Sequence, residues 1–401
     1  MDDHAPPDLP LRYPFALGPH GTPPPVLAWA RENRPVCPVT LPSGDRVWMI
    51  TRKDDIAQVF TDRRFSRDLT YPGAPRFVGA DFTVVPGVIF NLDPPDHTRI
   101  RRVLNPFYTP ARVERYRQMI ERNADSLLEA MGSGRGPADL LQVYAAPLPL
   151  RVSCELLGIP IEHRVEYLHA FRTQIALNVE ADQVAAATKT TLEFTEQVIA
   201  AKQAAPGGDD PVSALVRAHR NGTISEQELH GTVSYLLVTG SDPLVSPVAT
   251  GVITLLRHRE QLGRCIAQPE LWPKAVEEVL RFHHNGVLGY PRVATEDVML
   301  HGVRIVEGDG VCAPMLGATW DERHYPDPGR FDIHRTTDAT ATFGAGPHFC
   351  LGAAFSRLYL TISFRALFER FPGLRLAVSE HDIPWRNDLG QTRPDQVPVS
   401  W

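Results

Sequence analysis

The segment Phe343–Gly352, "FGAGPHFCLG", decides how the rest of the chain is interpreted. It stands directly before "AAFSRLYLTISFRALFERF", whose apolar spacing predicts a helix. The glycines allow a tight loop, and Cys350 then lies at or near the helix N-terminus, where the helix dipole favours a thiolate. A thiolate faced by backbone N–H groups suits a soft, electron-donating metal ligand. The alternative is that Cys350 is a buried structural thiol, as most lone cysteines are.

The composition is typical of a large globular chain of one domain, residues 1–401. The 401 residues are 43% hydrophobic and 22% charged, and no Gly/Ser linker or charge block marks a boundary. The net charge of -6 argues against nucleic acid as the main partner. The five cysteines are scattered without C-x-x-C spacing, which favours neither a disulfide framework nor a zinc site and fits a reducing cytoplasm. The Pro-rich residues 1–25 predict an extended lead-in with no signal peptide or membrane anchor.

Apolar periodicity predicts a mainly α protein with small β-sheets, an α+β fold. Residues 36–52 alternate around a Ser-Gly-Asp turn and predict a β-hairpin, and "KDDIAQVF" after it predicts a helix. Helical spacing continues over residues 99–131 and 140–157. Ser225 and Glu228 form a capping box that starts a long, nearly apolar helix. Residues 271–283 predict another helix, and residues 292–315 predict short strands.

The cysteine loop resembles the haem-binding loop of the cytochrome P450 family. The pattern is Phe-x-x-Gly-x-x-x-Cys-x-Gly, with Gly-x-His before the cysteine. A member of this family carries Glu-x-x-Arg on an upstream helix, and "EEVLR" supplies Glu278 and Arg281 on one helix face. In "YPDPGRFD", which resembles the family's meander segment, Arg330 is expected to complete a buried Glu-Arg-Arg network.

The resemblance extends over almost the whole chain and implies a set of haem-binding residues. In "DPPDHTRIRRVL", His97 and Arg101 match the family's propionate-binding pair, and their i, i+4 spacing places them on one helix face. Arg292, at the start of "RVATEDV", and His348, in the cysteine loop, are expected to bind propionates too. Each alone could be an ordinary surface residue. The other cofactor-binding residues that the resemblance implies, all in the cysteine loop, are Phe343, Gly344, Cys350 and Gly352.

By this resemblance the protein is a haem-thiolate oxidoreductase with the cytochrome P450 fold, with a long distal helix over haem b and Cys350 as the axial iron ligand. A thiolate-ligated haem favours O–O cleavage, so we expect monooxygenase chemistry on a mid-sized natural-product intermediate. A soluble, monomeric, cytoplasmic protein, with electrons from a ferredoxin and its reductase, is expected. A basic docking face and a merely solvated helix face are equally good interpretations of the arginines nearby, which are Arg99, Arg102, Arg112, Arg115 and Arg117.

The distal helix departs from the family pattern. The family has a small residue, Gly, any residue, an acid and Thr, where the acid and the alcohol deliver protons to bound oxygen. Here the order is Thr239-Gly240-Ser241-Asp242-Pro243, so the acid is present and the threonine is a proline. Pro243 has no N–H and clashes with the carbonyl of residue 239, so the helix is expected to open there, and Pro247 is expected to disturb the next turn.

Four residues are therefore candidates for proton handling: Thr239, Ser241, Asp242 and Pro243. The hydroxyl of Thr239 or Ser241, or a water on the freed carbonyl, could replace the missing alcohol. One interpretation is that Pro243 only kinks the helix and water carries the protons. The other is chemistry without ordinary hydroxylation: a substrate hydroxyl as relay, a coupling or desaturation without oxygen transfer, or an oxidant such as peroxide or nitric oxide, as in nitration.

Other functions are less well supported. A haem-less P450-like docking module would not need the haem-binding residues. A dinucleotide site at "GSGRG", residues 132–136, is disfavoured because the motif follows a helix. "FHHN", residues 282–285, has no third metal ligand at suitable spacing. By resemblance, the substrate pocket is formed by residues 71–89, 171–179, 235–244, 286–288 and 389–392.

Overall fold

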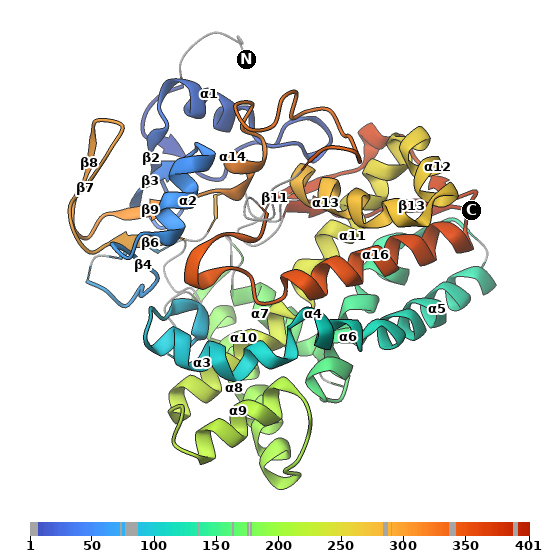
Figure 1. Cartoon of the computed structure of the whole chain (residues 1–401), viewed down its shortest axis with the longest axis horizontal. Helices are drawn as coiled ribbons and strands as arrows, with labels where there is room; N and C mark the ends of the chain where they lie inside the picture. Colours follow the sequence, from blue (N-terminus) through green and yellow to red (C-terminus); the bar gives the residue numbers. More distant parts are fainter. Residues whose placement is uncertain are drawn as a thin grey trace.

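The computed structural model describes residues 7–72, 74–76, 87–134, 136–162, 164–174, 176, 179–283, 288–289, 291–336, 342–387 and 392–401. A 6-stranded sheet and its neighbouring hairpin lie at one side, and the helices form the larger body on the other side (Figure 1). This is the predicted mainly α fold with small sheets. The helices are α1 Pro25–Asn33, α2 Lys53–Thr61, α3 Asp96–Leu104, α4 Pro110–Glu114, α5 Arg117–Ser133, α6 Pro147–Leu157, α7 Arg164–Gln174, α8 Ala181–Ala204, α9 Pro211–Arg220, α10 Glu226–Thr239, α11 Asp242–Arg257, α12 Arg259–Ala267, α13 Trp272–Phe282, α14 Met315–Thr319 and α16 Ala353–Arg370.

The large sheet has the strand order β1-β2-β3-β9-β6-β4. Its centre is the predicted hairpin, in which β2 and β3 pair antiparallel with Val36 opposite Ile50. The expected lead-in is tied to this sheet, because β1 pairs parallel with β2 and Leu11 and Tyr13 are buried. The strands are β1 Leu11–Arg12, β2 Val36–Thr40, β3 Arg46–Ile50, β4 Phe65–Ser66, β5 Ala138–Asp139, β6 Pro291–Ala294, β7 Val298–Leu300, β8 Val303–Ile305, β9 Gly310–Cys312, β10 Arg375–Leu376, β11 Trp385–Asn387, β12 Thr392–Pro394 and β13 Pro398–Ser400.

Prolines divide the helical stretch that periodicity predicts over residues 99–131. α3 ends at Leu104, and Pro106 lies in the short helical turn Asn105–Phe107. Pro110 begins α4, with Thr109 as its N-cap. A proline cannot donate the hydrogen bond that a helix interior requires, but it costs nothing in a first turn. The stretch is therefore helical, as predicted, but the two prolines divide it into separate helices.

The distal helix consists of two segments through the middle of the molecule, α10 and α11 (Figure 1). α10 begins with the predicted capping box of Ser225 and Glu228. The two segments together are long and apolar enough to cross a membrane, but 83% of the most apolar window is buried inside the molecule, as in a core helix. They belong to different hydrophobic cores: α10 shares one with residues of α7, α8 and α9, whereas α11 shares the other with residues of α5, α13 and α16.

Candidate functional site

The Cys350 loop connects the sheet side of the molecule to α16. Gly344 and Gly346 have φ angles of 73° and 69°, which favour glycine over residues with a side chain. The N–H of Cys350 donates to the carbonyl of Phe343 at 3.0 Å, and the N–H of Ala353 donates to the carbonyl of Cys350 at 3.4 Å. The tight loop therefore fixes Cys350 just before the first turn of α16, as the glycine spacing predicts.

Cys350 differs from the other cysteines, which are all buried, because its side chain is exposed to a cavity. Its surroundings lie deep in the molecule, and this burial raises the pKa of the thiol. The backbone N–H of Gly352 and the charges of Arg101 and Arg357 act in the opposite direction. A buried structural thiol does not need these groups, whereas a thiolate that binds a metal is stabilised by all of them.

A cluster of cationic and imidazole side chains lines the cavity beside Cys350. The rings of His97 and His348 lie 4.2 Å apart between their centroids. Arg101 donates to the carbonyl of Phe349 at 2.6 Å, and Arg292 donates to the carbonyl of Phe65 at 3.0 Å. In the described part of the chain, neither guanidinium has a carboxylate partner. The structure thus brings together all four residues that the resemblance implies for the propionates.

Arg67 is a further member of this cluster that the sequence did not reveal. It is 3% exposed, lines the same cavity, and donates to the carbonyl of Pro291 at 2.5 Å. Its guanidinium carbon lies 3.8 Å from the centroid of the Phe90 ring. Arg67 directly follows β4, which pairs with β6, the strand that carries Arg292. No spacing motif marks Arg67, because only the sheet brings it to the site.

The electrostatics of this cluster fit an anionic ligand. Burial and the neighbouring charge of Arg101 lower the pKa of His97 to about 4, and burial and the charge of Arg67 lower the pKa of Arg292 to about 9. Within the described residues, the buried Nδ1 of His97 and Nε2 of His348 have no hydrogen-bond partner. Buried polar atoms are rarely left unpaired. Two carboxylates would satisfy these atoms and offset the crowded positive charge, so the residues fit a haem with its propionates.

The Glu-Arg-Arg network is present, but its third member is Arg335. Glu278 and Arg281 are each 1% exposed and form a bidentate pair at 2.8 Å, and the Nε of Arg335 lies 3.3 Å from Glu278 Oε1. The expectation for Arg330 is wrong: its side chain is 69% exposed and lies 3.7 Å from Asp332. Arg335 also donates to the carbonyl of Arg330 at 2.8 Å. The turn therefore directs Arg330 outward and Arg335 inward.

The distal helix opens beside this cavity between Thr239 and Asp242, within the turn that Pro243 is expected to disturb. α10 ends at Thr239, and α11 begins at Asp242 with Pro243 in its first turn, where the missing N–H is tolerated. The expected second disturbance is wrong, because α11 continues through Pro247. Thr239 lines the cavity, and its hydroxyl donates to the carbonyl of Tyr235 at 2.9 Å. Ser241 is 1% exposed and is not part of the cavity lining.

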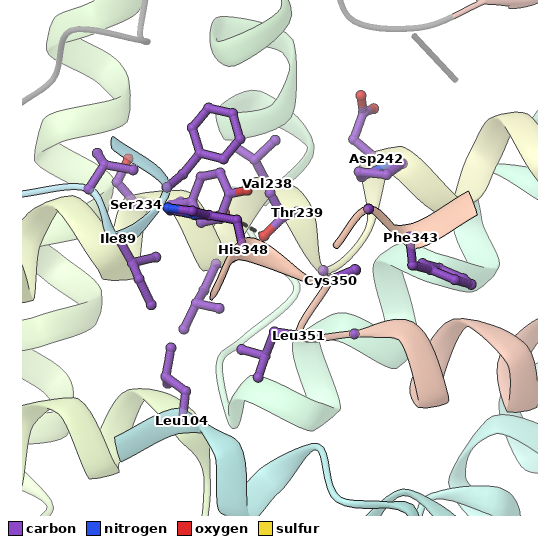
Figure 2. A pocket seen from close by; sticks show the side chains of 18 of the residues that line it. Ile89, Leu104, Ser234, Val238, Thr239, Asp242, Phe343, His348, Cys350 and Leu351 are labelled. Atoms are coloured by element: carbon purple, nitrogen blue, oxygen red, sulfur yellow. Dashed lines mark hydrogen bonds between the residues drawn. The ribbon is translucent and has the colours of Figure 1, made fainter. Parts of the chain in front are cut away.

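Asp242 is held in an ion pair. It is 4% exposed, and the Nε of Arg172 donates to its Oδ1 at 2.9 Å. Its carboxylate points away from Cys350 (Figure 2). The sequence does not predict the partner, because Arg172 is 70 residues away on α7. The ion pair therefore holds the carboxylate of Asp242 away from Cys350.

The cavity has a volume of about 700 Å³ and lies between the distal helix and the cysteine loop (Figure 2). Of the expected pocket segments, residues 73, 77–86, 175, 177–178, 286–287 and 389–391 lie outside the described residues, as do Arg135 and the His284–Asn285 part of "FHHN". Among the described residues, no cluster of histidine, cysteine or acidic side chains could hold a metal ion. Helix α8 contributes a wall that the sequence did not predict, through Thr188, Thr191, Leu192 and Thr195.

Ion pairs neutralise three of the five arginines for which a docking face and a solvated helix face are both open interpretations. Arg99 pairs with Glu228 at 2.7 Å, Arg112 pairs with Asp209 at 2.8 Å, and Arg117 pairs with Glu114 at 2.5 Å. Exposed pairs of this kind leave little net charge to attract a partner. Arg102 and Arg115 are exposed.

Comparison with known proteins agrees with this geometry. The family model described as Cytochrome P450 matches residues 264–390. Nocardicin C N-oxygenase from Nocardia uniformis subsp. tsuyamanensis is 35% identical over 98% of this chain and 98% of its own length. The mycinamicin VIII C21 methyl hydroxylase of Micromonospora griseorubida has a TM-score of 0.91 at 30% identity, over 98% of this chain and 100% of its own. The enzyme CxnD, for C–S bond formation in chuangxinmycin biosynthesis, has a TM-score of 0.86 at 30% identity, over 95% and 94%.

Proposed function

Because the chain belongs to the cytochrome P450 family, as a monooxygenase-type oxidoreductase of secondary metabolism, we propose that it oxidises a mid-sized natural-product intermediate with O2. Electrons would come from a ferredoxin and its reductase. We also propose that residues 1–401 form one domain and that the protein is monomeric and cytoplasmic. The exposed Arg102 and Arg115 are the remaining candidates for contact with the ferredoxin.

The observation that carries the proposal is the cavity that joins Cys350 to the buried cationic cluster. The sulfur and the unpaired imidazole atoms of His97 and His348 line one space. A thiol alone, or a cationic cluster alone, would be compatible with several ligands. Together they suit one ligand that carries a metal ion and two carboxylates, as haem b does. The haem-less docking function is disfavoured because it leaves these buried polar atoms unsatisfied.

Haem b held here by Cys350 would supply O2 activation, and the thiolate would favour O–O cleavage. His97, Arg101, Arg292 and His348 would bind the propionates, with Arg67 beside them. The cysteine loop would hold the sulfur in position through the hydrogen bond from the Cys350 N–H to the Phe343 carbonyl. These side chains bind and orient, and the apolar lining excludes water.

Proton delivery is the part of the reaction for which this chain has unusual residues. Pro243 has no hydroxyl. The hydroxyl of Thr239 already donates its hydrogen to the carbonyl of Tyr235, so it can accept a hydrogen bond but has no second hydrogen to donate. Asp242 is engaged by Arg172. Protons could therefore be delivered by a water bound to the Thr239 carbonyl, which receives no hydrogen bond from Pro243 because proline has no N–H. A hydroxyl of the substrate could also deliver them.

This scarcity of proton donors keeps a second candidate reaction open. Oxidative C–C or C–N coupling, desaturation, nitration or a peroxide-driven oxidation would depend less on controlled protonation than hydroxylation does. The relatives span such differences, since one is named for N-oxygenation and another for C–S bond formation. The cavity lining, which is mostly apolar with neutral polar groups on α8 and α10, fits a substrate without strong charge.

The experiment is an optical titration of the purified haem protein against a panel of natural-product intermediates, followed by turnover with ferredoxin, its reductase and NADPH. Hydroxylation adds one oxygen atom to the substrate, coupling or desaturation removes two hydrogens, and nitration replaces a hydrogen by a nitro group, so mass spectrometry distinguishes these products. A peroxide-driven oxidation is distinguished by product formation with peroxide in place of NADPH. A binding spectrum with product formation supports the proposal. A protein that retains haem but oxidises no member when electrons or peroxide are supplied would contradict it.

A further inference from the structure

The opening of the distal helix leaves the backbone carbonyl of Leu237 to be satisfied by a side chain. In a continuous helix the N–H of Ser241 would donate to the carbonyl of Leu237, four residues earlier. Here Ser241 has φ -130° and ψ -58°, and its N–H donates to the carbonyl of Val238 at 3.1 Å. The carbonyl of Leu237 therefore loses its helical partner in a segment that is buried. An unpaired buried carbonyl destabilises the fold unless another donor replaces the N–H.

Arg164 supplies that donor from α7. Its Nη2 donates to the carbonyl of Leu237 and to the hydroxyl of Ser153, the latter at 3.2 Å. Arg164 is 0% exposed, and in the described part of the chain its Nε and Nη1 have no hydrogen-bond partner. A cation at the C-terminal end of α10 also interacts favourably with the helix dipole. Gly240 makes room for this arrangement, because a Cβ there would lie 2.6 Å from the Ser153 hydroxyl.

Arg172 holds the other side of the opening from the same helix. It pairs with Asp242, the first residue of α11, whereas Arg164 contacts the last turn of α10. The two arginines are eight residues apart, about two helical turns, and so approach the distal helix from one side of α7. α10 and α11 belong to different hydrophobic cores, so their relative position is not fixed by apolar packing alone.

We propose that α7 is a clasp, in which Arg164 and Arg172 are positioning residues that together hold the opening of the distal helix over Cys350. In this role Asp242 is an anchor for α11. Phe171 and Gln174, on the same helix, line the cavity, so a ligand that contacts them acts on the helix that sets the opening. Ligand binding and the geometry of the opening are thereby coupled. This inference rests on the proposed function in one respect: it assumes that the reaction takes place at the Cys350 side of the cavity.

Hydrogen–deuterium exchange on the haem protein tests the clasp directly. In Arg164→Met, the amides of residues 236–244 should exchange roughly tenfold faster or more, the equivalent of one lost hydrogen bond from a charged donor. Arg164→Lys keeps a donor that can reach the Leu237 carbonyl and should recover part of the protection. Arg172→Gln should accelerate exchange in the first turn of α11. The matched control is Arg122→Met, which removes an exposed arginine paired with Glu155 at 2.8 Å.

A second measurement shows whether the change reaches the cavity. The C–O stretching band of the reduced protein with carbon monoxide should shift or broaden in Arg164→Met and Arg172→Gln, and stay unchanged in Arg122→Met. Unchanged exchange at residues 236–244 together with an unchanged C–O band would overturn the clasp. It would mean that the buried guanidinium of Arg164 lowers the stability of the folded protein without positioning the opening of the distal helix. Because every variant keeps Cys350 and the cationic cluster, that result would leave haem binding and the proposed function standing.

Discussion

Replacing Arg335 by methionine should destabilise the protein far more than the same change at Arg330. The sequence pattern favours Arg330 as the third member of the network with Glu278 and Arg281, whereas the structure assigns this position to Arg335. Met is apolar, unbranched and similar in length to the aliphatic part of arginine, so the change removes the guanidinium and keeps most of the packing. The two arginines lie in the same turn, which makes each variant the control for the other.

The magnitude follows from the contacts. Besides Glu278, Arg335 donates to the carbonyls of Pro326 at 2.8 Å, Asp327 at 3.0 Å and Arg330 at 2.8 Å, and its side chain is 12% exposed. Each hydrogen bond from a charged group contributes about 1.5–3 kcal/mol, but the surface carbonyls can bind water instead. Glu278 also keeps Arg281. We therefore expect Arg335→Met to cost about 2–4 kcal/mol.

Arg330→Met should cost about 0–1 kcal/mol, because its ion pair is exposed and long. The assay is urea unfolding of the haem protein, followed by far-UV circular dichroism and by haem absorbance. Arg335→Lys, which keeps the charge and loses the planar fork, should lie between the parent and Arg335→Met. Equal destabilisation by Arg330→Met and Arg335→Met, or a larger effect at Arg330, would refute the assignment.

Three further predictions concern the haem, the pH dependence of stability and proton delivery. Arg292→Met should speed haem transfer to a scavenger protein by about tenfold, the equivalent of one charge-assisted hydrogen bond. The control Arg304→Met, which removes an exposed ion pair with Asp297, should leave the transfer rate unchanged. Equal transfer rates in the two variants would contradict a propionate-binding role for Arg292. Burial and the charge of Arg257 lower the pKa of His283 from 6.5 to about 3. Between these pH values the unfolded chain binds more protons than the folded chain, so the free energy of unfolding falls as the pH drops below about 6.5. This residue contributes up to about 1.4 kcal/mol per pH unit. His283→Gln should flatten the dependence of the urea midpoint on pH between 4 and 7, and an unchanged slope would exclude His283 as its source. Pro243→Thr restores an N–H and a hydroxyl and should raise the fraction of electrons recovered in product; unchanged coupling would mean that the proline does not shape catalysis.

The sequence predicts the local elements and the cysteine loop well because their determinants are local. Alternation around a turn predicts the β2–β3 hairpin, the Ser225 capping box predicts the start of α10, and the glycine spacing predicts the loop before α16. The same holds for His97 and Arg101, since their i, i+4 spacing is a helical property. These features depend on residues that are neighbours in the chain.

The sequence does not predict partners that only the tertiary fold brings together. Arg67 joins Arg292 through the pairing of β4 with β6, and Arg172 reaches Asp242 across 70 residues. Arg330 and Arg335 are five residues apart, and only the conformation of their turn decides which one faces Glu278. Pro243 predicts the opening of the distal helix, but not that Arg164 and Arg172 of α7 contact its two sides.

The measurement that tests the central claim most directly is the absorption spectrum of the reduced protein with carbon monoxide. If Cys350 binds the haem iron as a thiolate, the parent protein shows the red-shifted Soret band that gives the cytochrome P450 family its name. Cys350→His should replace that band by one at shorter wavelength, typical of haem with an imidazole ligand. A parent protein that binds no haem, or a red-shifted band that survives in Cys350→His, would contradict the assignment of this site.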